Sequence, residues 1–290
     1  MSHRAALGYL TRRVHQPQSG SDPRVLRSAV HSLRIRPLRE GTVTRQHEQE
    51  FENRLAAVDR DARGCAIYGY CGFAVDFVAG EPVILDRINE HASFWQAIIA
   101  ALQSAMFVSL GRFFDDDRNA HSAADCLSYA EHYRGIFSRE ALKSRKILEG
   151  LDPALAAEYV AAAWEPRESS FSGLRAELDA RRQLFKERVA PIRHRVYAHS
   201  GRITGTERDK LFGALLVREL EELLVFTLQF SQALWHLYHN GREPTLAPAP
   251  SLIGEVVKAP PGPHRSTWEH LHITEDAVSF LRRMKLGPRE

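Results

Sequence analysis

The stretch FWQAIIAALQSAMFVSLG, residues 94–111, decides the fold class because it carries no charged side chain across 18 positions. That length approaches the length of a membrane span. However, Gln96, Gln103 and Ser104 interrupt its apolar surface, and the charged run RFFDDD follows at once. A helix that is apolar on nearly every side is also typical of the centre of a helical bundle. We therefore expect a central bundle helix here and no contact with a membrane.

Outward from this stretch, apolar residues recur at three- and four-residue steps, whereas the alternating β-branched runs that indicate strands are scarce. Helices are expected over residues 44–79, 86–115, 122–134 and 138–148, from Asp152 onward, from Ser172 to Pro191, and from Thr206 to Gly241. Gly69, Gly72 and Gly80 are expected to weaken or divide the first helix. Pro191 is expected to break or kink its helix, because the ring removes a donor. Helices joined by short links predict an all-α, antiparallel helical bundle.

Charge and proline content divide the chain into three parts. Residues 1–45 hold nine arginines, no lysine and two acidic residues. Such asymmetry is typical of an arm that touches nucleic acid, and equally of an unfolded leader or an untranslated upstream extension, which we favour. Residues 243–263 hold six of the 14 prolines, as a linker does. We expect a basic flexible arm over 1–44, the bundle over 45–241, and a Pro-rich linker with a short tail over 242–290, including one short helix after Thr274.

Composition and motif content exclude several classes of protein. The net charge of +3 gives little support to binding of polyanions by the whole surface. The N-terminus lacks a signal-peptide core, and the three cysteines form no CxxC pair and no even disulfide set, which indicates a reducing, cytoplasmic location. Gly-rich phosphate loops and GxSxG elbows do not occur in the sequence. Three groups of possible metal ligands lack the further ligands that a zinc or calcium site needs: His270 with His272, His236 with His239, and Asp115–Asp117. We therefore expect no metal and no cofactor.

The stretch PIRHRVYAHS, residues 191–200, concentrates chemically active side chains between a charged helix and a Gly-containing turn. Histidine moves a proton near neutral pH. Arginine holds a phosphate bidentately and stabilises the charge that builds in a transition state. These two groups are what cleavage of a phosphodiester needs when no metal takes part. The competing interpretation is the solvated end of a charged helix.

Within that stretch, RHRVYAHS resembles the signature of the HEPN superfamily, the all-helical domains of prokaryotic defence and toxin systems. In that signature an arginine and a commonly polar residue precede a histidine, with four to six residues between arginine and histidine; Arg193, His194 and His199 match it. Residues 94–123, FWQAIIAALQSAMFVSLGRFFDDDRNAHSA, are similar to the first conserved helix of the abortive-infection, AbiU-like branch, with its Arg-Phe-Asp turn and serine-led helix. The YAHS ending fits the same branch, and the resemblance covers residues 45–240.

The resemblance implies a metal-independent endoribonuclease that acts in phage defence or as a toxin. It further implies a homodimer whose two motifs meet at a shared cleft, RNA as substrate, and a possible cognate antitoxin or defence partner. Arg193 would bind the scissile phosphate, His199 would serve as general acid or base while the 2′-hydroxyl attacks, and His194 would orient the pair. The alternative is a non-catalytic HEPN module that binds a partner protein or a nucleotide.

Helical spacing favours a different arginine from the one that the family signature favours. At about 100° per residue on a regular helix, Arg193 and His199 lie roughly 120° apart, whereas Arg195 and His199 share one face. We follow the signature for Arg193 and assign Arg195 a second phosphate contact. Tyr197 either donates to the RNA or packs in an interface. Arg202, just past the turn, is assigned to the RNA backbone.

Overall fold

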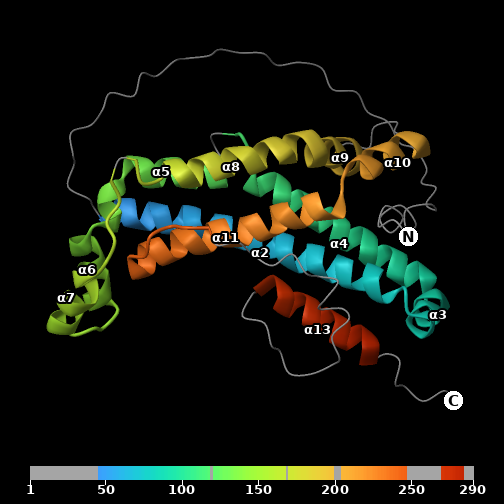
Figure 1. Cartoon of the computed structure of the whole chain (residues 1–290), viewed down its shortest axis with the longest axis horizontal. Helices are drawn as coiled ribbons and strands as arrows, with labels where there is room; N and C mark the ends of the chain where they lie inside the picture. The colour runs from blue at the N-terminus through green and yellow to red at the C-terminus, as the bar shows by residue number, and fades with distance from the viewer. Residues whose placement is uncertain (1–44, 118–119, 168, 199–203, 247–268, 284–290) are drawn as a thin grey trace, which may run out of the picture.

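The computed structural model describes residues 45–117, 120–167, 169–198, 204–246 and 269–283. Every regular element in these ranges is helical, which confirms the predicted all-α fold. The long helices lie side by side in an elongated bundle (Figure 1), with α6 and α7 at one end and α3 and α10 at the other. The arm over residues 1–44 and most of the Pro-rich stretch lie outside the described residues.

The elements follow one another as α-helices joined by single 3₁₀ and π-helical turns. In chain order they are α2 (Arg45–Val78), α3 (Pro82–Glu90), α4 (Ala92–Phe113), α5 (Ala123–His132), η1 (Arg134–Phe137), α6 (Arg139–Leu148), α7 (Pro153–Ala161), α8 (Ser172–Leu184), η2 (Phe185–Val189), α9 (Ala190–Ile192), η3 (Arg193–Ala198), α10 (Gly205–Ala214), α11 (Val217–Asn240) and α13 (Glu269–Arg283).

Helix α2 is the central element, and it packs against α4, α11 and α13. Contrary to the expectation, Gly69 and Gly72 do not divide it, because α2 runs unbroken over 34 residues. Its buried side chains, such as Ala66, Tyr70 and Phe73, lie within the core. Each large buried apolar side chain contributes roughly 1.5–3 kcal/mol, which exceeds the cost of about 1 kcal/mol for a helical glycine.

Helix α4 is the apolar helix from which the fold class was inferred. Among the described residues it is the one helix long and apolar enough to cross a membrane by length and composition, and 39% of its most apolar window is buried inside the protein. Its buried residues Met106, Phe107 and Leu110 join the core together with side chains of α2 and α11. Helix α4 therefore packs as a helix of the bundle.

Two predicted helices are each divided in two. The helix expected over 86–115 is interrupted at His91, whose φ of −125° and ψ of 42° are not helical, so α3 and α4 are separate. The helix expected from Thr206 to Gly241 is interrupted at Leu215 and Leu216, which are extended. There the Glu219 carboxylate accepts a hydrogen bond from the Leu216 N–H at 2.9 Å and begins α11. The cap of α10 is Thr204 rather than Thr206.

Pro191 was expected to break or kink the helix that starts at Ser172; the helix is not broken there and continues to Ala198. Its backbone widens to π-helical turns on both sides of Pro191, in η2 and η3. A wider turn tolerates the missing proline donor and the bulk of its ring better than a regular α-helical turn does. The proline therefore reshapes this helix without breaking it.

A buried arginine and a left-handed glycine fix the end of the bundle opposite to α10. Arg145 on α6 is 7% exposed and pairs with Glu48 of α2. It also donates to the carbonyls of Ile136 at 2.8 Å and Tyr238 at 2.9 Å, so that it ties three elements together. Gly241 ends α11 at a φ of 59°, the left-handed conformation expected of a glycine at this position.

The tail helix is longer than the short helix predicted after Thr274. Helix α13 begins at Glu269 and runs for 15 residues. It lies along α2 (Figure 1) and buries Leu271, Val278 and Leu281. Arg63 of α2 pairs with Glu269 at 2.6 Å, and Arg282 pairs with Glu81 at 2.9 Å. This helix is therefore part of the packed structure.

Candidate functional site

The Arg/His-rich stretch lies in the last turns of the helix that continues through Pro191. Residues Arg193–Ala198 form the π-helical turn η3, which packs against α4 and follows α9. Such π-helical turns occur frequently at functional sites in proteins. His194 and Arg195 are exposed, whereas Arg193 and Tyr197 are half-buried. The segment thus presents one pair of side chains to solvent and another pair to the bundle.

Arg193 lies against the last turns of α4, at Gly111. A Cβ atom on Gly111 would lie 2.2 Å from the Arg193 Nε and 2.7 Å from its Cζ, far inside contact distance. The absence of a side chain at this buried glycine therefore makes the space that the guanidinium occupies. Within the described ranges Arg193 forms no ion pair with a carboxylate. Packing against α4 therefore holds the side chain in place.

Tyr197, one turn after Arg193, faces the same helix. Its ring stacks on Phe107 with centroids 5.2 Å apart, and its hydroxyl donates to the Gln103 Oε1 at 3.3 Å. Burial raises the pKa of Tyr197 to about 12, and the nearby charge of Arg208 opposes that rise. Tyr197 is therefore a protonated packing residue at neutral pH, with a hydroxyl that can donate but does not exchange a proton.

Gln103, Phe107 and Gly111 form a stripe at four-residue steps on α4, and this stripe receives Tyr197 and Arg193. Sequence reasoning assigned no role to Gly111. The signal that could have found it is the spacing itself, because a small residue at the end of a regular helical stripe marks a position where another element approaches closely.

Two of the predicted site residues, His199 and Arg202, lie outside the described residues. The structure brings together Arg193 and Tyr197 on the side that faces α4, and it places Arg195 on the exposed side. His194 is exposed and has an interaction within the protein. The two arginines of the motif therefore face different surroundings.

Comparison with known proteins addresses the family of the chain. The sequence profile of the AbiU2 family of HEPN domains matches residues 48–258, which is more than half of the chain and includes both the apolar helix α4 and the motif. The chain belongs to the AbiU2 family. No curated protein and no solved structure matches this AbiU2-family domain. The match extends past α11, beyond the expected limit at residue 240.

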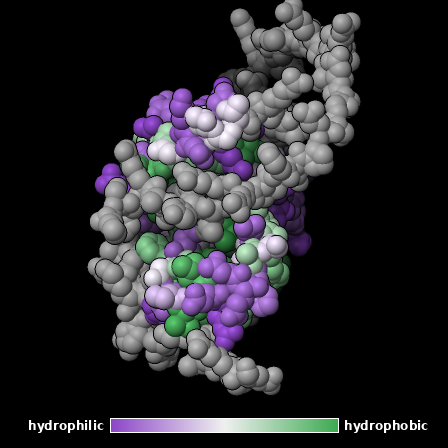
Figure 2. Space-filling view, turned by 90° about the vertical axis from the view of Figure 1, so that its right-hand side faces the viewer, coloured by the Kyte–Doolittle hydropathy of each residue, from purple (hydrophilic) through white to green (hydrophobic). Residues whose placement is uncertain are grey.

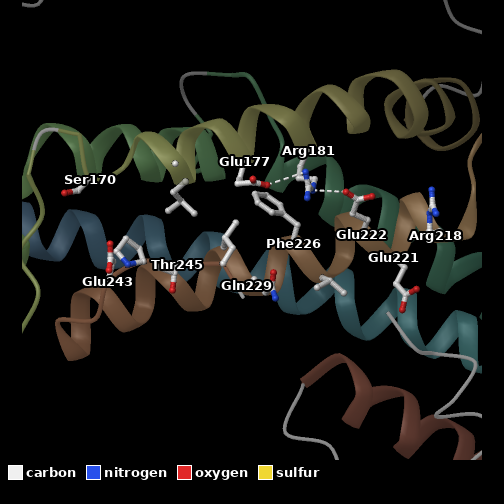
Figure 3. Close-up of a pocket in the computed structure, with 15 residues that line it drawn as sticks. Ser170, Glu177, Arg181, Arg218, Glu221, Glu222, Phe226, Gln229, Glu243 and Thr245 are labelled. Atoms are coloured by element: carbon white, nitrogen blue, oxygen red, sulfur yellow. Dashed lines mark ion pairs between the residues drawn. The ribbon is translucent and has the colours of Figure 1, made fainter. Parts of the chain in front are cut away.

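A cavity of about 780 Å³ opens between α8 and α11, away from the motif (Figure 3). Arg181 lies between two carboxylates there, 3.5 Å from Glu177 and 3.2 Å from Glu222. Glu221 and Glu243 also line the cavity. Arg218 lines it as well, so four glutamates and two arginines give this cavity of the AbiU2-family domain a net acidic lining.

A second cavity, a groove of about 830 Å³, lies between α2, α4 and α13 and is almost entirely apolar. Phe94 of α4 and Phe280 of α13 flank it, and both side chains are 59% exposed. At one end of the AbiU2-family domain, hydrophobic residues appear at the surface among hydrophilic ones (Figure 2). Exposed apolar patches of this kind are typical of sites that contact another macromolecule.

The candidate metal ligands named from the sequence contact other side chains of the protein. Among the described residues, no three His, Cys, Asp or Glu side chains gather in a way that could hold a metal ion. His270 is buried with its ring 5.3 Å from that of Tyr70, and the Nδ1 of His236 lies 2.9 Å from Asn240. Asp116 pairs with Arg182 and with Lys186. These contacts describe helix packing and surface ion pairs.

Burial also governs the cysteines of the AbiU2-family domain. Burial raises the pKa of the Cys65 and Cys126 thiols, and it raises that of the half-buried Cys71 thiol as well. Since the thiolate is the nucleophilic form, these thiols are poor nucleophiles at neutral pH.

Proposed function

We propose that this AbiU2-family domain is a metal-independent endoribonuclease of HEPN type. It acts in the cytoplasm as a homodimer, in phage defence or within a toxin–antitoxin pair. The family itself is linked to abortive infection. One observation carries the proposal: the motif arginine, Arg193, is held against α4 by packing at Gly111 while no carboxylate in the described part of the chain neutralises it.

The reaction divides the work between two side chains. Arg193 binds the scissile phosphate and stabilises the negative charge that builds on its oxygens. His199 removes the proton of the 2′-hydroxyl or delivers one to the leaving 5′-oxygen, and solvent water exchanges the other proton. The 2′-oxygen forms its bond to phosphorus as the bond to the 5′-oxygen breaks, which leaves a cyclic phosphate. His194 orients this pair, while Arg195 and Arg202 contact the RNA backbone.

The test is cleavage of RNA by the purified full chain in the presence of a chelator. We expect products that end in a cyclic phosphate. Arg193→Ala and His199→Ala should each lower the rate by roughly 10²-fold or more, the size of a positioned proton transfer or of one transition-state donor. Arg175→Ala, which removes an arginine paired with Glu131 elsewhere on the surface, is the matched control. Absence of cleavage, or equal cleavage by all variants, contradicts the proposal.

A second candidate function, a non-catalytic module that binds a partner protein, is supported by the apolar groove between α2, α4 and α13. Such a partner would cover Phe94 and Phe280. The test is association with a protein encoded beside this one, measured for the wild type and for Phe94→Ser. Binding that the substitution abolishes, together with RNA that stays intact, supports this candidate over the nuclease.

A further inference from the structure

Helix α10 packs against α9, the turn that leads into η3. Phe212 of α10 is buried, and its ring lies 6.2 Å from that of Phe107, the same ring on which Tyr197 stacks. A capping box fixes the start of α10, because Thr204 accepts from the Glu207 N–H while Glu207 accepts from the Thr204 N–H. Helices α9 and α10 lie next to each other at one end of the bundle (Figure 1). Residues of α10 are therefore held beside the motif.

Arg208 is a residue of α10 whose side chain lies near the motif. Its guanidinium lies over the Phe212 ring at 5.8 Å from the centroid, within the range of a cation–π contact. Its charge also reaches the Tyr197 hydroxyl, where it opposes the rise of the pKa that burial causes. Arg208 thus lies on one side of Tyr197, and Arg193 lies one helical turn away along η3.

Arg208 lacks the partner that a half-buried arginine normally has. Its Nε is buried without a hydrogen-bond partner, as are those of Arg54 and Arg145, which pair with carboxylates through their terminal nitrogens. Arg208 differs from these two because it forms no ion pair with a carboxylate within the described ranges. Stacking on Phe212 orients the planar group and leaves its terminal N–H groups for a polar partner, such as an anion.

The charges around Arg208 on α10 are mixed. Two acidic residues, Glu207 and Asp209, flank it in the sequence. The pKa of Glu207 is lowered by hydrogen bonds from Thr204 and further by the charges of Arg195 and Lys210. Its carboxylate is therefore engaged in the helix cap and surrounded by positive charge. Arg193 and Arg208 both lie near Tyr197, whereas Arg195 lies on the exposed side of η3 and near Glu207.

We infer that Arg208 is a further RNA-binding residue of this site, which holds a phosphate neighbouring the scissile one. This inference rests on the proposed ribonuclease function and deepens it, because it places the RNA across η3 and α10. A guanidinium fixed by an aromatic ring presents its planar fork to phosphate oxygens, a contact that a flexible lysine does not reproduce. Since such a contact positions the backbone without reading the bases, it is independent of RNA sequence.

The experiment measures RNA binding by the full chain in a His199→Ala background, so that the RNA stays intact. Fluorescence anisotropy with two single-stranded RNA oligonucleotides of unrelated sequence gives Kd over a range of salt concentrations. Arg208→Gln should raise Kd roughly tenfold for both oligonucleotides, as expected for loss of a charged hydrogen bond. It should also reduce the slope of log Kd against log salt by about 0.7, the contribution of one phosphate contact on a single strand.

Lys143→Gln on α6, at the other end of the bundle (Figure 1), removes the same charge and should leave both quantities unchanged. Arg208→Lys keeps the charge but loses the fork, so it should restore the salt slope while Kd stays raised; it also replaces Arg208→Gln if that variant unfolds. An Arg208→Gln variant that binds like the Lys143→Gln control overturns the inference and leaves the nuclease intact. Weaker binding of only one of the two RNA oligonucleotides also overturns it. If the His199→Ala parent binds no RNA, the proposed function fails and the inference falls with it.

Discussion

Gly111→Ala tests the packing of the motif arginine with a single added methyl group. The new Cβ would lie 2.2 Å from the Arg193 Nε, 2.6 Å from its Cδ and 2.7 Å from its Cζ. Because carbon atoms make contact at about 3.5–4.0 Å, the guanidinium must move by roughly 1 Å or more. The arginine side chain is flexible at this end, so it can move out without forcing the helices apart.

The expected effect on cleavage is much larger than the effect on stability. A displacement of about 1 Å at a phosphate-binding group costs on the order of 10²-fold in rate. Replacing a helical glycine by alanine, in contrast, stabilises a helix by about 1 kcal/mol, which offsets the strain of moving Arg193. We expect kcat for RNA cleavage to fall about 10²-fold, with a melting temperature close to that of the wild type.

Gly72→Ala is the matched control, because Gly72 also lies inside a helix but a Cβ there would have nothing within 4 Å. It should cleave RNA at the wild-type rate and be slightly more stable. Single-turnover cleavage and thermal unfolding, measured on the same preparations, provide both readouts. Wild-type cleavage by Gly111→Ala, in a protein for which Arg193→Ala is inactive, would refute the argument that Gly111 fixes the position of the guanidinium.

Four further substitutions test other parts of the structure. Arg145→Met should lower the free energy of unfolding by about 3–5 kcal/mol in urea titrations, because it removes a buried charge that contacts α2, η1 and α11 and leaves Glu48 without its partner. An unchanged midpoint of unfolding contradicts this. Gly241→Ala should lower stability by at least about 1 kcal/mol, since its φ of 59° is left-handed and a Cβ would lie 2.7 Å from the Ala163 Cβ. Burial raises the pKa of Asp76 to about 7, so its folded-state contribution is complete below pH 4 and is lost as pH rises through 7; Asp76→Asn should therefore raise the melting temperature at pH 8 but not at pH 4. Tyr197→Phe should cost about 0.5–1 kcal/mol of stability and leave cleavage nearly intact, and a large loss of cleavage would show that the hydroxyl contacts the RNA.

The helices themselves were predictable from apolar periodicity, but two of their boundaries were not. Residues 86–115 and 206–241 carry apolar patterns without a glycine or proline at the points where the chain turns. The turn at Leu215 and Leu216 depends on a carboxylate, Glu219, that captures a backbone N–H, and a leucine pair gives no sign of this. A local helix cap therefore sets this boundary, whereas packing of the large side chains of α2 keeps Gly69 within that helix.

The candidate site was predictable in its chemistry and only partly in its geometry. Arg193 and Tyr197 could be named from the motif, whereas the azimuth that favoured Arg195 assumed a regular α-helix. The π-helical turn after Pro191 changes the angular step per residue, so that calculation does not apply to η3. Arg208 could not be found, because no local pattern shows that α10 folds back onto the motif.

The distribution of ion pairs gives a physical reason to place an anion at this end of the bundle. Two other buried or half-buried arginines face carboxylates: Arg145 pairs with Glu48, and Arg175 pairs with Glu131. The half-buried Arg134 donates to a backbone carbonyl instead. Arg193 and Arg208 have no such partner among the described residues, although both are partly buried against other side chains. Partly buried charges without partners raise the free energy of the folded chain. Folding alone does not account for this arrangement, whereas a phosphate backbone bound across η3 and α10 would neutralise both charges at once.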